Sequence, residues 1–457
     1  MGRAFAATVD RAALRALNYA PELRGSAGRR GPGLGELLAE LAPAYGQVFT
    51  RIDCEPEHGV ELLSQSDMFA AEPQGRVIRR DSMPVPERHL VSRWQVLIAG
   101  AGTLGETELY GRSIVADARL AGKYVGPHAV VLTFTEPESD QTLFAYAYLL
   151  SRNGIAAVRA TSYGTKVLGV RFDLLRSLRL PEASTAVQRR VAHLVRQAVE
   201  GREAHLERVQ HARGTLLSAE PMAEAARLCA KRSRKAVAWR EPLPTMVAWN
   251  CASAGEALPL LRRASKTRLR DVLADGGVFR GDRAARVTCE SPHGIDFYSQ
   301  RDVFLARPVP RRVVQPDIDA DRLFARPGTL LAGGHGTLGE GEIFGRVVMV
   351  TRSMERVGMS EDLLRIRTRS EHAAVVYTFL SSVVGLRLLR STAVGTKLLS
   401  MRPDLVAELP FPEVSSEARA TIDDDVTRAM AAREAADAAE TEAIRIMEEE
   451  VVPSWLA

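Results

Sequence analysis

Two nearly identical glycine-rich segments of this sequence have the spacing of a phosphate-binding loop. IAGAGTLGE begins at Ile98 and AGGHGTLGE begins at Ala332, and each contains G-x-G-x-x-G after a short apolar run. In dinucleotide-binding enzymes, such glycines turn a strand into a helix whose N-terminus holds the pyrophosphate. Here the first segment continues into SIVA and the second into VVMV, which favour strands. The pattern therefore indicates a turn between strands, and an enzyme that binds a nucleotide on these loops stays open as one alternative.

Other catalytic and metal-binding patterns are incomplete in this sequence. It contains no G-x-S-x-G, H-E-x-x-H or G-K-[ST] motif, no [ND]-P-P-[YF] tetrad and no Pro-Cys nucleophile of a DNA methyltransferase. C-x-x-x-H occurs at Cys54 and again at Cys289, but structural zinc needs four ligands and each segment offers two. The acidic run at residues 317–321 lacks the Glu-x-Lys partner of a nuclease. We therefore expect no catalytic residue and no metal.

The chain consists of two copies of one unit. RIDCEPEHGVELLSQSDMF at residues 51–69 matches RVTCESPHGIDFYSQRDVF at residues 286–304 without a gap. The glycine-rich segments follow in both copies. YGTKVLGVRFDLLRSLRLPEAS, from Tyr163, then matches VGTKLLSMRPDLVAELPFPEVS, from Val394. The same order in both halves indicates an internal duplication.

Each copy changes from a globular pattern to a long helix. The segments VLIAG, SIVADA, AVVLTF, VVMVTR and AAVVYTF, separated by Gly, Pro and Asp, predict strands. After Pro181 and Pro412, Ser or Thr N-caps precede apolar residues at helical spacing, with a break in the first seam near Gly201. These seams are Val187, Val191, Leu194, Ala198, Leu206, Val209 and Leu216, and then Ile422, Val426, Ala429, Ala436, Ala439, Ala443 and Ile446.

The predicted fold class is α+β, with two repeated globular domains, each followed by a long helix. We expect the domains at residues 31–181 and 259–412 and the helices at 182–220 and 413–452. An N-terminal extension (1–30) and a linker (221–258) complete the chain. Narrow apolar seams on two related helices favour pairing as an antiparallel coiled coil.

Charge is unevenly distributed along the chain. The net charge is +5, but the segment from Pro412 to Val452 carries 12 acidic and four basic residues, which leaves +13 for the remainder. A basic body suits phosphate contact, and an acidic helix suits contact with another protein. The four cysteines are too few for a disulfide scaffold, and no apolar run approaches the length of a membrane span. We expect a cytoplasmic location.

In its ordered motifs the chain resembles the DNA-specificity (S) subunit of type I restriction-modification systems. LGELLAELAPAYG, from Leu34, and LRDVLADGG, from Leu269, stand where that family's domains open with an "L-G-D-V" phrase. The G-T-L-G turns match at Gly102 and Gly336. The exit signal of the family, a G-T turn followed by "L-x-x-[IL]-x-[IL]-P" and the helix, matches in both copies, but the Glu of the family's helical Glu-Gln pair is missing.

The resemblance implies a subunit that is not itself an enzyme. Each globular part would be a target-recognition domain reading one half of a split double-stranded DNA target, and the helices would set the distance between the halves. The helices would also bind two methyltransferase (M) subunits, which supply S-adenosylmethionine and methylate adenine. A nuclease or translocase (R) subunit would join in systems that also restrict. The chain itself would bind no cofactor.

Candidate DNA contacts are arginines and polar residues on predicted loops. Arginine both binds phosphate and pairs with guanine. Domains that read different half-sites must differ at base-reading positions, so residues shared by the copies suit phosphate contact or a structural role. The shared set is Arg51, Gln65, Thr103, Arg112 and Lys166, with the repeat mates Arg286, Gln300, Thr337, Arg346 and Lys397. Base reading is expected where the copies diverge, at Arg280 and Arg283 beside Phe279 or at Gln74, Arg76 and Arg79.

Two further interpretations remain. The arginines of the divergent set fit a solvated surface as well as base reading. A scaffold or adaptor of an anti-phage defence complex, with little DNA sequence preference, would use the same long helices.

Overall fold

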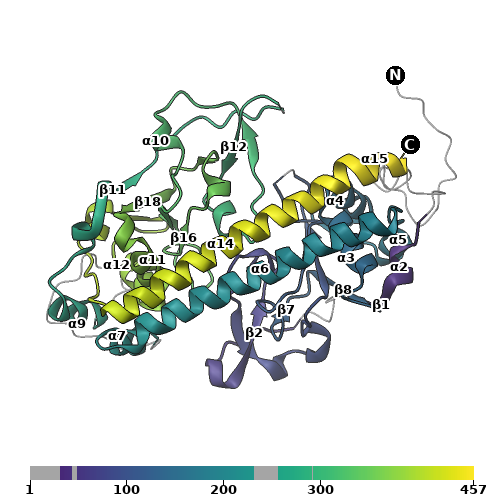
Figure 1. The fold of residues 1–457 in the computed structure, drawn as a ribbon. Helices are drawn as coiled ribbons and strands as arrows, with labels where there is room; N and C mark the ends of the chain where they lie inside the picture. The colour runs from purple at the N-terminus through teal and green to yellow at the C-terminus, as the bar shows by residue number, and fades with distance from the viewer. Residues whose placement is uncertain (1–30, 44–48, 106, 231–255, 291, 457) are drawn as a thin grey trace. The chain divides into compact units, whose positions relative to one another are not determined.

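The computed structural model describes residues 31–43, 49–105, 107–230, 256–290 and 292–456. It divides into a first unit, residues 1–200 with 435–457, and a second unit, residues 201–434. Each unit contains one globular part and half of each long helix (Figure 1). The predicted N-terminal extension, Cys251 and most of the predicted linker lie outside the described residues.

Both units contain the same three small sheets in the same strand order. The first unit has the sheets β1-β8-β4-β6, β3-β2-β7 and β5-β10-β9, and the second has β11-β18-β14-β16, β13-β12-β17 and β15-β20-β19. The strands of the first unit are β1 (Leu38–Pro43), β2 (Gly59–Leu63), β3 (Arg76–Arg79), β4 (Val96–Ala99), β5 (Ala101–Gly102), β6 (Ser113–Val115), β7 (Tyr124–Val125), β8 (Ala129–Phe134), β9 (Ser162–Gly164) and β10 (Leu168–Val170). Those of the second are β11 (Leu273–Arg280), β12 (Ile295–Tyr298), β13 (Arg311–Val313), β14 (Leu330–Gly333), β15 (His335–Gly336), β16 (Val347–Met349), β17 (Gly358–Met359), β18 (Leu363–Thr368), β19 (Ala393–Gly395) and β20 (Leu399–Met401). The duplication seen in the sequence is therefore a duplication of the fold.

The first and last segments of each globular part lie side by side. In the first unit, the amide of Leu34 donates to the carbonyl of Leu178 at 2.8 Å. In the second, the amide of Leu269 donates to the carbonyl of Leu409 at 2.9 Å. The opening phrase and the exit motif thus pair with each other, which closes each globular part just before its long helix.

One predicted strand is a helix. AAVVYTF lies in α11 (Ala373–Ser381), whose counterpart in the first unit is α3 (Asp140–Leu150). Its β-branched residues suggested a strand, but the segment is buried on all sides between a sheet and the long helices, and tertiary packing outweighs local propensity there. The globular parts also contain the short helices α2 (Leu34–Leu37), α4 (Arg152–Ala160), α5 (Phe172–Ser177), α10 (Ala320–Leu323), α12 (Val383–Ser391) and α13 (Pro403–Ala407).

The two long helices run antiparallel. They are α6 (Thr185–Ser218) and α14 (Ser416–Ile446), the latter continued by a π-helical turn (Met447–Val451) and α15 (Val452–Leu456). Arg190, near the start of α6, bonds Glu442 at 2.9 Å in the first unit, and His211, near the end of α6, bonds Asp425 at 2.5 Å in the second. Helix α6 continues through Gly201, where its apolar seam breaks.

The predicted caps are confirmed in both helices. The predicted seam is fully buried in α14, whereas Val187, Leu194 and Leu206 of α6 are only half-buried. The hydroxyl of Ser184 accepts from the amide of Val187 at 3.4 Å, and that of Ser415 accepts from Ala418 at 3.2 Å. All seven predicted seam residues of α14 are buried.

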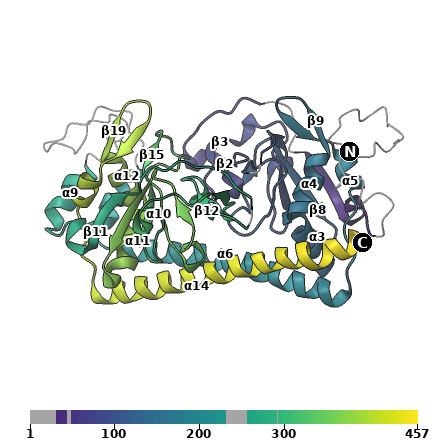
Figure 2. The ribbon, with the colours of Figure 1, turned by 90° about the horizontal axis from the view of Figure 1, so that it is seen from above.

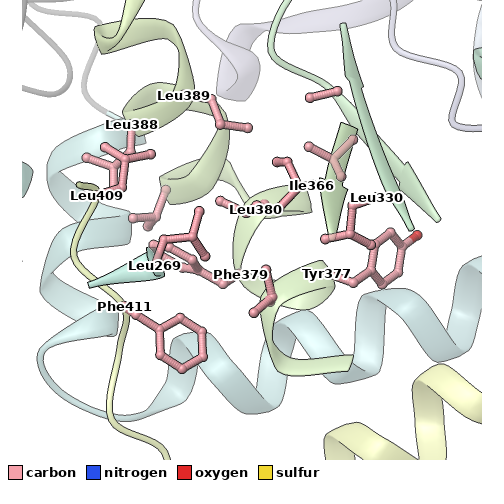
Figure 3. Packing of buried hydrophobic residues seen from close by; sticks show 14 of the residues in the cluster. Leu269, Leu330, Ile366, Tyr377, Phe379, Leu380, Leu388, Leu389, Leu409 and Phe411 are labelled. Atoms are coloured by element: carbon pink, nitrogen blue, oxygen red, sulfur yellow. The ribbon is translucent and has the colours of Figure 1, made fainter. Parts of the chain in front are cut away.

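The core of the second unit joins the sheet, the helices α11 and α12, and the long helices. Figure 3 shows Leu269, Leu409 and Phe411 in one cluster with Phe379, Leu380 and Leu388, so the start and exit segments are packed on the same core. Part of the predicted linker belongs to this core, because Met222, Ala225 and Cys229 of α7 (Met222–Ala230) are buried in it. The helix α9 (Ala257–Ala264) also packs here.

Among the described residues, no single helix is long and apolar enough to cross a membrane. One bent pair, residues 370–381 with 383–391, meets the length and composition criteria.

Candidate nucleic-acid interface

Each unit carries two exposed turns next to each other on one three-stranded sheet. In the first unit, the turn at residues 102–105 leaves β5 and the turn at residues 164–167 joins β9 to β10. Leu168 of β10 pairs with Gly102 of β5, so the two turns are neighbours. In the second unit, the turns at residues 336–339 and 395–398 are joined in the same way, through Leu399 and Gly336. We call these the paired turns; the β9 and β19 hairpins that carry half of them are labelled in Figure 2.

The paired turns present lysine, threonine and apolar side chains to solvent. Lys166 and Lys397 are exposed, as are Thr103 and Thr337. The residue after each lysine is an exposed aliphatic side chain, Val167 at 62% and Leu398 at 72%. A cation, hydroxyl groups and an apolar contact on two adjacent turns match the phosphates, sugars and base edges of DNA.

A glycine fixes the shape of the hairpin turn in both units. Gly164 has φ +93° and Gly395 has φ +107°, which L side chains rarely adopt. A Cβ at either glycine would lie 2.6 or 2.7 Å from the carbonyl oxygen of Val167 or Leu398. Each lysine is therefore presented on a turn whose shape requires glycine.

The predicted glutamines hold the glycine-rich turn by its backbone. The Gln65 side chain donates to the carbonyl of Ala101 at 2.7 Å and accepts from the amide of the same residue at 3.1 Å. Gln300 makes the same two bonds to His335, at the same distances. Since both ends of each amide are engaged, these side chains shape the turn; a role in DNA contact stays untested.

The predicted arginines of the Gly-Arg pairs close the same turn from its far end. Arg112 Nε donates to the carbonyl of Glu108 at 3.0 Å. Arg346 Nε donates to the carbonyl of Glu342 at 3.1 Å, and its Nη2 donates to that of Glu340 at 2.7 Å. These arginines are half-buried, which fits the structural one of the two roles expected for shared residues; a phosphate contact stays untested.

Sequence reasoning missed a second pair of arginines beneath the turns. Arg159 Nε donates to the carbonyl of Tyr110 at 2.8 Å, and Arg390 Nε donates to that of Phe344 at 2.9 Å. Burial lowers the pKa of Arg159 and lowers that of Arg390 to about 10. The signal was present in the repeat, because the arginines occupy equivalent places in VRATSYGTK and LRSTAVGTK.

The glycine-rich segments lead into strands, as predicted. The first turn is followed by β6 and the second by β16. The dinucleotide interpretation requires a helix at these points, and both described segments lack one.

Arg51 and Arg286, the first residues of the repeated segments 51–69 and 286–304, have different surroundings in the two units. Arg286 Nη2 lies 2.7 Å from the carboxylate of Glu361 and 3.1 Å from the hydroxyl of Ser360. The equivalent chain near Arg51 reads Gly126-Pro127, which offers no carboxylate, and Arg51 is exposed. Arg51 is therefore available to a phosphate, whereas Arg286 is neutralised within the protein.

The candidate base-reading arginines of the second unit also differ from each other: Arg280 is bonded within the protein and Arg283 is exposed. Arg280 is half-buried, and its Nη2 donates to the carbonyls of Gly334 and Met401 at 3.0 and 2.9 Å and to the hydroxyl of Ser400 at 2.9 Å. It therefore ties β11 to the sheet of the paired turns. The Arg283 side chain is 90% exposed, with Glu361 3.8 Å away.

In the first unit, two of the candidates form exposed ion pairs. Arg76 bonds Asp53 through both oxygens, and Arg79 bonds Asp81 in the same bidentate manner. Gln74 is exposed beside them. The partners of Arg76 and Arg79, Asp53 and Asp81, lie outside the paired turns, and the DNA contacts of all three candidates remain predictions.

The C-x-x-x-H segments form tight turns. A Cβ at Gly59 or Gly294 would lie 2.4 Å from the sulfur of Cys54 or Cys289. Cys289 donates from its thiol to the carbonyl of His293 at 3.2 Å. Within the ranges that the structure describes, no group of three or more His, Cys, Asp or Glu residues could hold a metal ion.

Comparisons with known proteins find similar solved structures, but with low sequence identity and low TM-scores. No protein-family model matches the chain, and no curated protein matches it. Three solved structures to which it is similar come from type I restriction-modification systems. One is the S subunit from M. genitalium, with 13% identity over 93% of this chain and 94% of that one and a TM-score of 0.32.

Two further solved structures give the same picture. The HsdS subunit from Thermoanaerobacter tengcongensis has 16% identity over 94% of this chain and 95% of that one, with a TM-score of 0.26. A chain from a structure on complex assembly and conformational transition of the type I R-M system has 15% identity, with 94% and 96% covered and a TM-score of 0.27. Because these values are low, the function below is argued from this chain's own residues.

Proposed function

We propose that this chain is the DNA-specificity subunit of a type I restriction-modification system. Residues 31–181 and 259–412 would act as target-recognition domains, each reading one half of a split double-stranded target. The chain would direct an adenine-DNA methyltransferase to that target and carry out no catalysis itself.

The observation that carries this proposal is the repetition of the paired turns. Both units expose a lysine, threonines and an aliphatic side chain on equivalent turns, and both hold those turns from within by a glutamine and an arginine. A duplicated, rigidly supported, cationic surface suits a ligand that has two similar halves. Split DNA sites have this property, because two half-sites share one phosphate backbone.

The antiparallel helices support the bipartite part of the proposal. Helices that bond at both Arg190–Glu442 and His211–Asp425 have a fixed register, and a fixed register would set the number of unread base pairs between half-sites. The acidic segment from Pro412 to Val452 would repel DNA phosphates and suits docking of two M subunits, which supply S-adenosylmethionine. An R subunit would join in a restricting complex.

The test is to co-express the chain with the methyltransferase encoded beside it and to map methylation base by base. We expect adenine methylation at one split motif, lost when the chain is omitted. Alanine at Lys166 or Lys397 should lower methylation of that motif, with the exposed Lys266 outside the turns as a matched control. A stable complex that methylates without sequence preference would favour the adaptor instead.

A further inference from the structure

The second unit contains a group of arginines around one aromatic ring that the first unit lacks. The guanidinium carbons of Arg322 and Arg367 lie 5.2 and 4.8 Å from the ring centroid of Phe279. Arg365 pairs with Phe279 across the β11–β18 ladder, and its side chain is fully buried. Figure 1 shows α10, which carries Arg322, beside these two strands. We call Arg322, Arg365 and Arg367 the arginine cluster.

Burial leaves the charge of Arg365 poorly compensated. Its Nη2 donates to the carbonyls of Leu323 and Met359, both at a long 3.3 Å. Its Nε and Nη1 have no hydrogen-bond partner in the described part of the chain. Burial, and then the charges of Arg367 and Arg322, lower its pKa to about 10, so the group is still a cation at neutral pH.

The surrounding carboxylates do not neutralise this cluster. Asp321 Oδ1 lies 2.9 Å from Arg326 and 3.5 Å from Arg367, so one acid is shared by two arginines. Glu361 is paired with Arg286 at 2.7 Å. Asp282 is exposed, and both it and Glu361 act on Arg365 through charge attraction. A buried guanidinium with unused donors and no dedicated carboxylate is costly unless an anion completes it.

The first unit supplies the comparison within the same chain. Leu97 of β4 pairs with Val131, whereas its repeat mate Leu331 of β14 pairs with Arg365. By the same register Thr133 stands where the second unit has Arg367, and Thr133 accepts from Gln95 at 2.9 Å. Phe279 pairs with Arg365 in the second unit, and Ala42 pairs with Val131 in the first. Ala42 therefore stands where the second unit has Phe279. The fold therefore does not require arginines at these positions.

We propose that the arginine cluster is a phosphate-binding site unique to the second unit. Arg322 is exposed and Arg367 keeps 18% of its side chain exposed, so these two form the entrance, with Arg365 as the charge behind them. Stacking on Phe279 fixes the entrance guanidiniums in place, which suits a tetrahedral dianion or phosphodiester. The phosphate can come from free phosphate or, if the proposed function holds, from the DNA backbone.

The first experiment compares the full-length chain with the double variant Arg365→Val, Arg367→Thr, which has the first unit's residues. Thermal unfolding is followed in inorganic phosphate and in chloride at equal ionic strength. We expect phosphate to raise the Tm of the wild type by several degrees more than chloride does, and the variant to lose this difference. Removing a poorly compensated buried cation should not prevent folding. Arg322→Ala is a second, exposed variant that should weaken the response. Arg356→Ala, at an exposed arginine outside the cluster and outside the candidate DNA contacts, is the surface-charge control.

The second experiment separates the two sources of phosphate. Duplex DNA affinity is measured against salt concentration, and loss of one DNA phosphate contact lowers the slope by about 0.9. A lower slope in the variant identifies the DNA backbone, and an unchanged slope with a lost Tm response identifies free phosphate. The proposal is overturned if the variants keep the wild-type Tm response to phosphate. Methylation mapping reports on the proposed function separately, so either idea can fail alone.

Discussion

Replacing Asp425 with alanine removes a buried carboxylate that joins the two long helices within the second unit. Asp425 is 2% exposed, and its oxygens accept from His211 Nδ1 at 2.5 Å and Arg208 Nη1 at 3.2 Å. Hydrogen bonds to a charged group contribute about 1.5–3 kcal/mol each. Both partner side chains are partly exposed, 63% and 42%, so water can solvate them after the change. We therefore expect a loss of about 2–3 kcal/mol in the free energy of unfolding.

The neighbouring residue provides a matched control. Asp424 forms an exposed i,i+4 pair with Arg428 at 2.9 Å, and such pairs contribute only about 0.3–0.5 kcal/mol. Asp425→Leu is a third variant, because Leu194 occupies the equivalent position in the first repeat. Leucine loses the same two hydrogen bonds but buries an apolar side chain in place of the carboxylate, so this variant should lose less stability than Asp425→Ala.

Denaturant unfolding of the full-length chain measures these differences. The midpoint should fall for Asp425→Ala with an unchanged m value, and should change little for Asp424→Ala. If Asp425→Ala loses no more stability than Asp424→Ala, the carboxylate does not stabilise the helix pair and the argument from its burial is wrong.

Three further outcomes follow from contacts within single units. Arg51→Ala should lower the salt slope of DNA binding by about 0.9, whereas Arg286→Ala, whose charge is already paired, should leave the slope unchanged; equal slopes would contradict the assigned asymmetry. Gly111→Ala should lower the Tm more than Gly122→Ala. Both glycines have φ near +80°, but only at Gly111 would a Cβ meet a side chain, 2.7 Å away. Equal losses of Tm would show that the backbone conformation alone sets the cost. Burial raises the pKa of Cys229 to about 12, so its thiol stays protonated at pH 8, and peptide mapping should find it unlabelled by iodoacetamide in the folded chain; rapid labelling would contradict its burial.

The sequence by itself determined the duplication, the two long helices and the turns between strands. These features rest on local patterns: the apolar spacing that buries Ile422 to Ile446 on one face, the serine caps, and the glycines whose φ no other residue adopts easily. The one wrong strand, AAVVYTF, is a segment whose burial on all sides removes any periodic signal.

Only the tertiary structure decided what the polar residues do. From the sequence, Gln65 could contact phosphate or have a structural role; in the structure, Ala101, 36 residues away, engages both ends of its amide. Arg51 and Arg286 are identical in the repeat, yet Glu361 pairs with only the second. The partners of a side chain come from segments far apart in the chain, and a charge acquires its function from those partners and from its burial. Neither is encoded in local spacing.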